Sequence, residues 1–206
     1  MPLDPELIKH YQKNKDKIKL RLLEFKQIKR ENYFYELCFC ICTPQSKAKS
    51  ALQVQNKLQS LDFYNKRFNP VELLNSPLHY IRFHNQKSER LIKAIDYFPD
   101  VLAILDSNFS TIEKRNTLQK VVNGFGMKEA SHFMRNIGYE GLAILDRHIL
   151  KNLVNNGIFK KLPQINTKNN YLETEKIFND FAKDIDIPID ELDLLFWSYE
   201  NGEIIK

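Results

Sequence analysis

The feature that most constrains the fold is the stretch Tyr33–Cys42, which is apolar on nearly all sides. A helix that is apolar all round must be covered by other elements on every side, so this stretch predicts a central helix. We expect the helix to end near Thr43-Pro44, because a residue that precedes proline is pushed out of the α region. The longest uninterrupted apolar run, Leu37 to Cys42, is far too short to span a bilayer.

Helical spacing of apolar residues recurs along the rest of the chain. The 206 residues include only 6 glycines and 8 prolines, which favours helices over a turn-rich β fold. The spacing predicts helices over 4–29, 47–61, 111–122, 127–137, 167–184 and 188–199, with short helices around Val71–Asn75 and Pro77–Tyr80, and a pattern over Ser88–Phe98 that restarts at Pro99. We expect an all-α fold, as one domain or two closely packed lobes, with at most a short extended segment at the end.

The charge and the N-terminal sequence indicate the class of protein and of partner. The net charge is +5 and the pI about 8.9, which is compatible with a polyanionic partner. Residues 1–30 hold nine Lys or Arg against four Asp or Glu, a pattern that is also typical of a solvated helix face. The start MPLDPELIKHYQ has no apolar signal region. We therefore expect a soluble, cytoplasmic protein with no membrane partner.

The three cysteines, Cys38, Cys40 and Cys42, alternate within the predicted central helix. A helix turns these side chains toward different faces, and neither a CxxC pair nor a second cluster of metal ligands accompanies them. We interpret them as small buried hydrophobic residues. No catalytic metal is expected, because no His, Asp or Cys cluster has ligand spacing.

The segment VVNGFGMKEASHFMRN places two glycines, Gly124 and Gly126, between two predicted helices. Glycines at this spacing allow a hairpin too tight for side chains and permit positive φ. The amides at the start of the second helix then lack helical partners, and with the helix dipole behind them they form a phosphate site. A plain αα-hairpin would show the same two glycines, so the predicted helix-hairpin-helix element, about 112–137, is weak evidence by itself.

A lysine and an aspartate near the hairpin make the pattern more specific. Lys128 lies two residues past Gly126, in the first turn of the second helix, where a cation is disfavoured by ~0.3–1 kcal/mol. A lysine at this position indicates either phosphate binding or a depressed pKa. Eighteen residues later, Asp146 stands where the next helix begins and is predicted to be its N-cap.

These motifs resemble a known enzyme family. The form GxGxKEASHFxRNxG followed by LAILDRH is similar to the archaeal-type 8-oxoguanine DNA glycosylase/AP lyases, the second 8-oxoguanine glycosylase type, of the helix-hairpin-helix glycosylase superfamily. The segments YELCFCICTPQSKA, RFHNQKSERL and LDLLFWSYENGEIIK also agree, so the resemblance covers essentially the whole chain after Tyr33. One departure is Pro44-Gln45, where the family more often has Ala-Asn.

The resemblance implies a two-lobed helical fold with the active site between the lobes, and a bifunctional repair enzyme. Lys128 would attack the deoxyribose C1′ and form a Schiff base, and β-elimination would cleave the strand. A lysine of ordinary pKa, ~10.4, is only about 0.04% neutral at pH 7, whereas burial beside a helix N-terminus can lower the pKa to roughly 7–8. Asp146 would stay ionised, stabilising positive charge on the sugar and helping to deprotonate Lys128.

The resemblance also implies which residues recognise the lesion. Trp197, the only tryptophan, would stack on the flipped base, although a lone tryptophan is more often a core residue. Lys206 and its terminal carboxylate would contact the base, with the carboxylate accepting from the N7–H that oxidised guanine has and guanine lacks.

Four other residues have two readings each. Gln45 either fills the gap left by the flipped base or is a turn residue after proline. His132, four residues after Lys128, either lines the site or is a structural histidine. Arg135 and His148 are weaker candidates, for phosphate or packing roles.

The expected partner is double-stranded DNA containing 8-oxoguanine, bound by a monomer. The family implies no required cofactor, although hairpin carbonyls in this superfamily often hold a monovalent cation. Three alternatives remain open: a non-catalytic helix-hairpin-helix DNA-binding module, a glycosylase that acts on another lesion or lacks lyase activity, and a helical protein-interaction domain.

Overall fold

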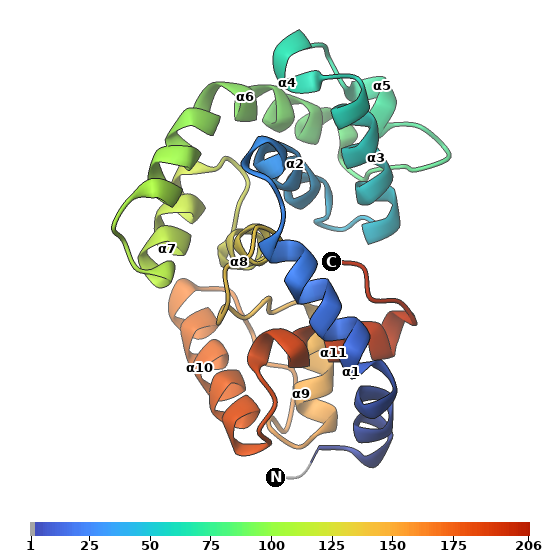
Figure 1. The fold of residues 1–206 in the computed structure, drawn as a ribbon, viewed down its shortest axis with the longest axis vertical. Helices are drawn as coiled ribbons and strands as arrows, with labels where there is room; N and C mark the ends of the chain where they lie inside the picture. The colour runs from blue at the N-terminus through green and yellow to red at the C-terminus, as the bar shows by residue number, and fades with distance from the viewer. Residues whose placement is uncertain (1–2) are drawn as a thin grey trace. The chain divides into compact units, whose positions relative to one another are not determined.

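The structure, a computed structural model, describes residues 3–206 and is helical throughout (Figure 1). No strand occurs within this range, so the extended segment expected at the end does not form one. The elements in chain order are α1 (Pro5–Lys26), the 3₁₀ turn η1 (Arg30–Asn32), α2 (Tyr33–Cys42), α3 (Ala48–Ser60), α4 (Phe63–Lys66), α5 (Val71–Leu74), α6 (His84–Asp106), α7 (Thr111–Val121), α8 (Met127–Asn136), α9 (Arg147–Asn155), α10 (Lys168–Asp184) and α11 (Ile189–Asn201).

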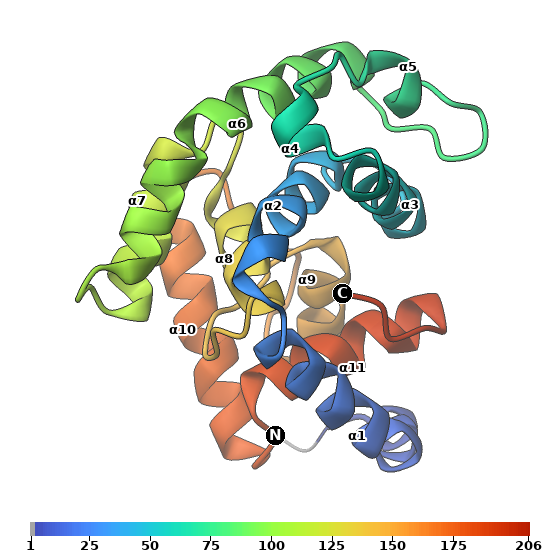
Figure 2. The same cartoon turned by 45° about the horizontal axis from the view of Figure 1, so that its top comes forward.

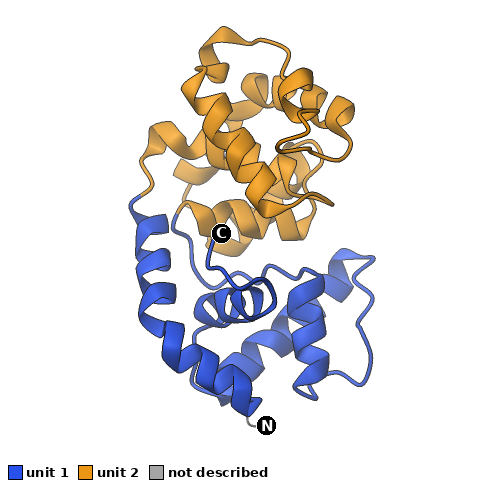
Figure 3. Ribbon diagram, turned by 90° about the vertical axis from the view of Figure 1, so that its right-hand side faces the viewer, with its two compact units in different colours: residues 1–27, 138–206 blue, residues 28–137 orange. Residues whose placement is uncertain are grey.

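The chain forms two compact units (Figure 3). The first unit combines the N-terminal segment that ends at Gln27 with Gly138–Lys206, and therefore contains α1, α9, α10 and α11. The second unit is Ile28–Ile137 and contains η1 and α2 to α8. The first unit is thus built from both ends of the sequence, and the second is inserted between them.

In the second unit α2 is the central helix, as predicted (Figure 2). It packs against α3, α6 and α8, and every residue from Phe34 to Cys42 is buried. The three cysteines are free thiols, and each is 0% exposed. This confirms the prediction that they are small buried hydrophobic residues. Their neighbour Glu36 is buried as well, and its carboxylate accepts from Gln55 of α3 (2.8 Å) and Asn136 of α8 (3.2 Å). These two bonds fix α2 to both helices, because a buried carboxylate must be hydrogen-bonded.

The helices α7 and α8 pack against each other and form the hairpin. α7 begins with a capping box, in which the Ser110 hydroxyl and the Glu113 carboxylate each satisfy the other's backbone amide. A fully buried arginine, Arg115 of α7, donates to the Ser131 hydroxyl of α8 (3.4 Å). The predicted helices 111–122 and 127–137 therefore have bounds within a residue of those observed.

In the first unit α1 packs along α11, and α9 and α10 pack on α11 as well. Asp4 caps α1 by accepting from the Glu6 amide (2.8 Å). The Tyr11 hydroxyl of α1 donates to Glu191 of α11 (2.7 Å), and burial together with this carboxylate raises the pKa of Tyr11. The rings of Phe178 and Phe196 stack with centroids 6.0 Å apart, so apolar packing joins α10 to α11.

Two local predictions were wrong, and one short helix was not predicted. Pro77–Tyr80 is a turn and not a helix; Leu78 is 84% exposed there, and four residues without a buried apolar face cannot offset the cost of helix nucleation. α6 runs through Pro99 without a restart, because packing of the buried Phe98 and Val101 outweighs the one hydrogen bond that proline cannot make. α4 was missed, since it lies between two left-handed residues, Asp62 and Arg67, that no turn signal marks.

None of the helices within residues 3–206 is long and apolar enough to cross a membrane.

Candidate active site

The hairpin between α7 and α8 depends on Gly124. Its φ is +87°, in the left-handed region that favours glycine. A Cβ built at this position would lie 2.7 Å from the guanidinium carbon of Arg90, so the glycine also makes room for an arginine of α6. The turn closes with a hydrogen bond from the Phe125 amide to the Val122 carbonyl (3.1 Å). The prediction of a hairpin too tight for a side chain therefore holds at Gly124.

The second glycine, Gly126, differs from the prediction in two respects. Its φ of −93° and ψ of −174° are extended, so it does not need positive φ. Its amide is not a free donor either, because the Glu129 carboxylate folds back to accept from it (3.0 Å). The expected cluster of unpartnered amides at the start of α8 thus has one member fewer, since the third residue of the helix caps the first turn.

Lys128 is the second residue of α8, in the first turn as predicted. Its ammonium forms an ion pair with Glu129 (Nζ to Oε1, 2.9 Å), and its side chain is 31% exposed. Glu129 was not among the predicted site residues. It holds the hairpin amide with one carboxylate oxygen and the lysine with the other, and so balances the cation that the helix N-terminus disfavours. The signal for it was present, as a glutamate at the third position of a helix.

Two further predicted residues lie on α8. His132 is half-buried, one turn after Lys128, and its ring packs edge-on against Phe39 of α2 (centroids 5.5 Å apart). Arg135 is only 3% exposed, which favours its packing role over a phosphate contact.

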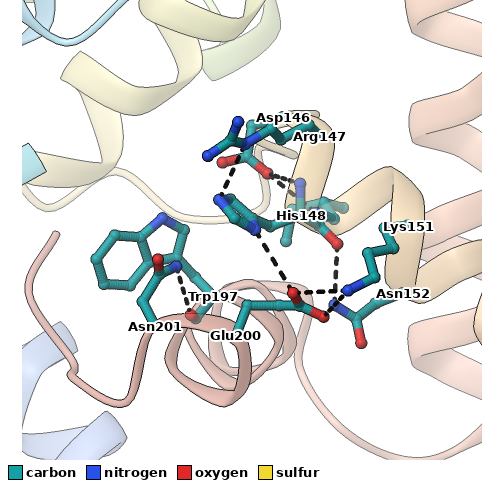
Figure 4. Close-up of polar contacts among 9 residues, drawn as sticks. Asp146, Arg147, His148, Lys151, Asn152, Trp197, Glu200 and Asn201 are labelled. Carbon is teal, nitrogen blue, oxygen red and sulfur yellow. Dashed lines mark hydrogen bonds and ion pairs between the residues drawn. The ribbon is translucent and has the colours of Figure 1, made fainter. Parts of the chain in front are cut away.

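Asp146 is the N-cap of α9, as predicted (Figure 4). Its Oδ1 accepts from the amides of His148 (2.8 Å) and Ile149 (2.9 Å). Both capping bonds end on Oδ1, so Oδ2 takes no part in capping the helix. The cap thus fixes the orientation of the acid and leaves it able to act on another group.

The segment before Asp146 is held by residues that sequence reasoning missed. Tyr171 and Glu175, one turn apart on α10, bind the same residue: the Tyr171 hydroxyl donates to the Ala143 carbonyl (2.6 Å), and the Glu175 carboxylate accepts from the Ala143 amide (3.0 Å). Asp190 of α11 accepts from the Gly141 amide (2.9 Å). These contacts join residues 28 to 49 positions apart, and no local pattern predicts them.

A polar chain connects α9 to α11 near Trp197 (Figure 4). Glu200 forms an ion pair with Lys151 (2.9 Å) and lies 3.9 Å from the His148 ring. Trp197 lies one turn before Glu200 on α11 and is half-buried. A tryptophan that keeps an accessible face is consistent with stacking on a ligand, whereas a core tryptophan would be covered.

Lys206 is only 8% exposed, although it is the last residue of the sequence. The segment before it is held by Arg21 of α1, whose side chain donates to the Ile205 carbonyl. The end of the chain is thus an ordered part of the first unit.

Gln45 is exposed in the turn after α2 and has a left-handed backbone, with φ of +56°. Lys87 of α6 holds this turn, because its Nζ donates to the carbonyls of Cys42 (2.8 Å) and Pro44 (2.6 Å). Lys87 is 2% exposed. Burial lowers its pKa to about 8, and the cations of Arg90 and Lys128 act in the same direction.

Each unit therefore contributes part of the predicted set. The second unit brings Lys128 together with the hairpin glycines and His132 on one helical hairpin. The first unit places Asp146 and Trp197 on facing helices, with Lys206 ordered in the same unit. Within residues 3–206 no three His, Cys, Asp or Glu side chains gather as metal ligands would.

Comparison with known proteins finds relatives from one enzyme family. A sequence model of the 8-oxoguanine DNA glycosylase family matches residues 18–187. The 8-oxoguanine DNA glycosylase/AP lyase of Fusobacterium nucleatum is 41% identical, over 98% of this chain and 96% of the relative. The enzyme of the same name from Methanocaldococcus jannaschii is 34% identical, over 93% of each.

Solved structures show the same fold. The M. jannaschii 8-oxoguanine glycosylase/lyase, in complex with a 15mer DNA containing 8-oxoguanine, superposes with a TM-score of 0.86 at 33% identity, over 98% of this chain and 100% of that one. The 8-oxoguanine DNA glycosylase of Thermotoga maritima gives a TM-score of 0.84 at 26% identity, over 98% and 97%. With an all-α helix-hairpin-helix glycosylase fold and relatives matched along nearly their whole length, this chain belongs to the 8-oxoguanine DNA glycosylase family.

Proposed function

We propose that this protein removes 8-oxoguanine from double-stranded DNA and cleaves the resulting abasic site, with Lys128 as nucleophile and Asp146 as its carboxylate partner. The observation that carries the assignment is the position of Lys128, in the first turn of α8 directly after the glycine hairpin. Family membership supports the reaction, since relatives matched over nearly their full length bear the names of this activity.

In the proposed reaction the Lys128 amine attacks the deoxyribose C1′. The C1′–N9 bond breaks, and its electron pair leaves with the base, which takes up a proton. The lysine nitrogen loses one proton, and its lone pair then forms the C1′=N bond of a protonated Schiff base while the C1′–O4′ bond breaks and O4′ takes up a proton, which opens the sugar ring. Removal of a proton from C2′ then expels the 3′ phosphate by β-elimination. Asp146 stabilises the positive charge that develops on the sugar, and its fixed Oδ1 and uncommitted Oδ2 suit that task. A single copy carries both residues, so we propose that a monomer is sufficient.

We propose that Trp197 stacks on the extruded base and that Lys206 contacts its edge. The half-buried indole and the ordered end of the chain support these assignments. Gln45 is proposed to enter the gap that the base leaves, because its side chain is exposed on a fixed turn. The amides at the hairpin that are not already bonded, as that of Gly126 is to Glu129, are assigned to the DNA backbone, and His132 is assigned to the wall of the site. The hairpin also offers backbone carbonyls, whose oxygens suit a monovalent cation. Comparing the yield of the borohydride-trapped adduct in potassium buffer and in a buffer with only organic cations would show whether the enzyme uses such a cation.

Borohydride trapping on a duplex with one 8-oxoguanine tests the central assignment. The reductant converts the Schiff base into a stable amine, so the wild type should give a covalent protein–DNA adduct and Lys128→Gln should give none. Lys120→Gln is the matched control, because it removes the same positive charge from an exposed lysine in the last turn of α7. This variant should still form the covalent adduct.

The other outcomes identify the alternatives. Binding without an adduct or cleavage would indicate a non-catalytic DNA-binding module. An adduct that forms on another oxidised base and not on 8-oxoguanine would reassign the lesion.

A further inference from the structure

A buried lysine that the proposed reaction does not use lies beneath the turn that carries Gln45. Lys87 of α6 is 2% exposed, and its Nζ contacts three oxygens of one short segment: the carbonyls of Cys42 (2.8 Å) and Pro44 (2.6 Å) and the hydroxyl of Ser46 (3.2 Å). These oxygens lie on both sides of Gln45. The ammonium therefore holds the two ends of the turn to one point.

This contact has a clear local cause at the end of α2. The last carbonyls of a helix have no intrahelical partner, and Cys42 is the final residue of α2. A cation is the favoured partner at a helix C-terminus. An apolar side chain of similar length would fill the same space without the cost of burying a charge, but it could not bind these oxygens.

The held turn contains an unfavourable backbone conformation. Gln45 has φ of +56°, in the left-handed region that is unfavourable for a residue other than glycine. Such a residue persists where its surroundings determine the conformation. Here the bonded neighbours are Pro44 and Ser46, on either side of Gln45, and the Gln45 side chain itself is exposed.

The same contacts reach the segment before α6. The Ser46 hydroxyl also accepts from the Arg82 amide (3.0 Å), and the Lys87 amide donates to the Phe83 carbonyl (2.9 Å). Phe83 is 46% exposed and is likewise left-handed, with φ of +60°. The Ser46 hydroxyl thus links the turn of Gln45 to the segment that ends at Phe83, and each of these segments carries an exposed non-glycine residue in the left-handed region.

We propose that Lys87 is a positioning residue for DNA engagement, which fixes the turn after α2 so that Gln45 is presented in the conformation that fills the gap beside an extruded base. This rests on the proposed function. Lys87 does not touch the DNA in this role; it acts through Gln45.

A double-mutant cycle on single-turnover excision from a duplex with one 8-oxoguanine tests the role. Lys87→Met keeps the length of the side chain and removes the donors, and Gln45→Ala removes the side chain that is positioned. Each substitution should lower the excision rate about tenfold. The double variant should be no slower than either single variant, because both substitutions remove the same function. Lys93→Met, at an exposed lysine on the same helix, should keep the wild-type rate.

Additive losses, about a hundredfold in the double variant, would overturn the proposal, because a merely structural lysine acts independently of Gln45. Wild-type rates for Lys87→Met would overturn it as well. If Lys87→Met does not fold, Ser46→Ala takes its place in the cycle, since it removes one of the three oxygens and the link to Arg82. Failure of the proposed function itself is distinguishable, because the wild type would then excise nothing.

Discussion

Glu129 binds the Lys128 ammonium with Oε1 (2.9 Å) and the hairpin amide of Gly126 with Oε2 (3.0 Å). The residue next to the proposed nucleophile is therefore also the cap of the helix that carries it. The ion pair must open before Lys128 can reach a sugar, whereas the cap can stay intact.

Substitutions at Glu129 should separate these two contacts. Glu129→Gln keeps an acceptor for Gly126 and weakens the ion pair, so trapping should rise, by about fivefold for a partly buried pair that contributes ~1 kcal/mol. Glu129→Ala loses the cap as well, and both duplex binding and trapping should fall. Equal behaviour of the two variants in binding and trapping assays would show that the charge, and not the cap, matters.

Gly124→Ala should weaken binding to any duplex, damaged or not. The left-handed backbone costs alanine roughly 1–2 kcal/mol, and the new methyl group would displace the Arg90 guanidinium that lies 2.7 Å away. Gly141→Ala is a matched control, since Gly141 is left-handed too but has no atom within 4 Å of the added Cβ. Both variants should lose similar stability in thermal unfolding. Only Gly124→Ala should lose affinity in a binding titration, and a loss of affinity in both would contradict the role of the hairpin.

Tyr171→Phe should slow excision more than it weakens DNA binding. The change removes the hydroxyl that holds the Ala143 carbonyl (2.6 Å), three residues before Asp146, and should destabilise the protein by about 1 kcal/mol. Tyr11→Phe removes a hydrogen bond of similar length in the same unit, to Glu191 (2.7 Å), away from this segment. Single-turnover rates and unfolding midpoints of both variants check the prediction, which fails if Tyr11→Phe slows excision equally.

Lys87 should make stability depend on pH above neutrality. Its pKa is about 8 in the folded protein and has the ordinary lysine value when unfolded, so below pH 8 both states carry the proton. Between pH 8 and about 10.5 the unfolded state binds more protons, and the contribution of Lys87 to the free energy of unfolding therefore rises with pH. Urea unfolding of the wild type and Lys87→Met across this range should show a difference that grows in favour of the wild type. Tyrosines with raised pKa values, such as Tyr11, act equally on both proteins and cancel. A difference independent of pH would show that Lys87 titrates normally.

The periodic parts of the fold were predictable, because their signals are local. The all-apolar stretch Tyr33–Cys42 needs burial on every side and is the central helix, and Asp146 is a cap because its side chain reaches amides only two and three residues away. The helix over Ser88–Phe98 was correct in type but wrong in extent, since packing carried α6 through Pro99. The short helix predicted at Pro77–Tyr80 was wrong, because proline marks turns and short helices alike.

The sequence by itself determined the all-α class, the glycine hairpin with Lys128 behind it, and the capping position of Asp146, since each depends on residues within one or two helical turns. Only the tertiary structure showed that Tyr171 and Glu175 bind Ala143, and that Lys87 supports the Gln45 turn. These contacts join residues about 30 to 45 positions apart. A buried polar group takes whichever partner the packing brings within reach, and no spacing in the sequence specifies which one that is.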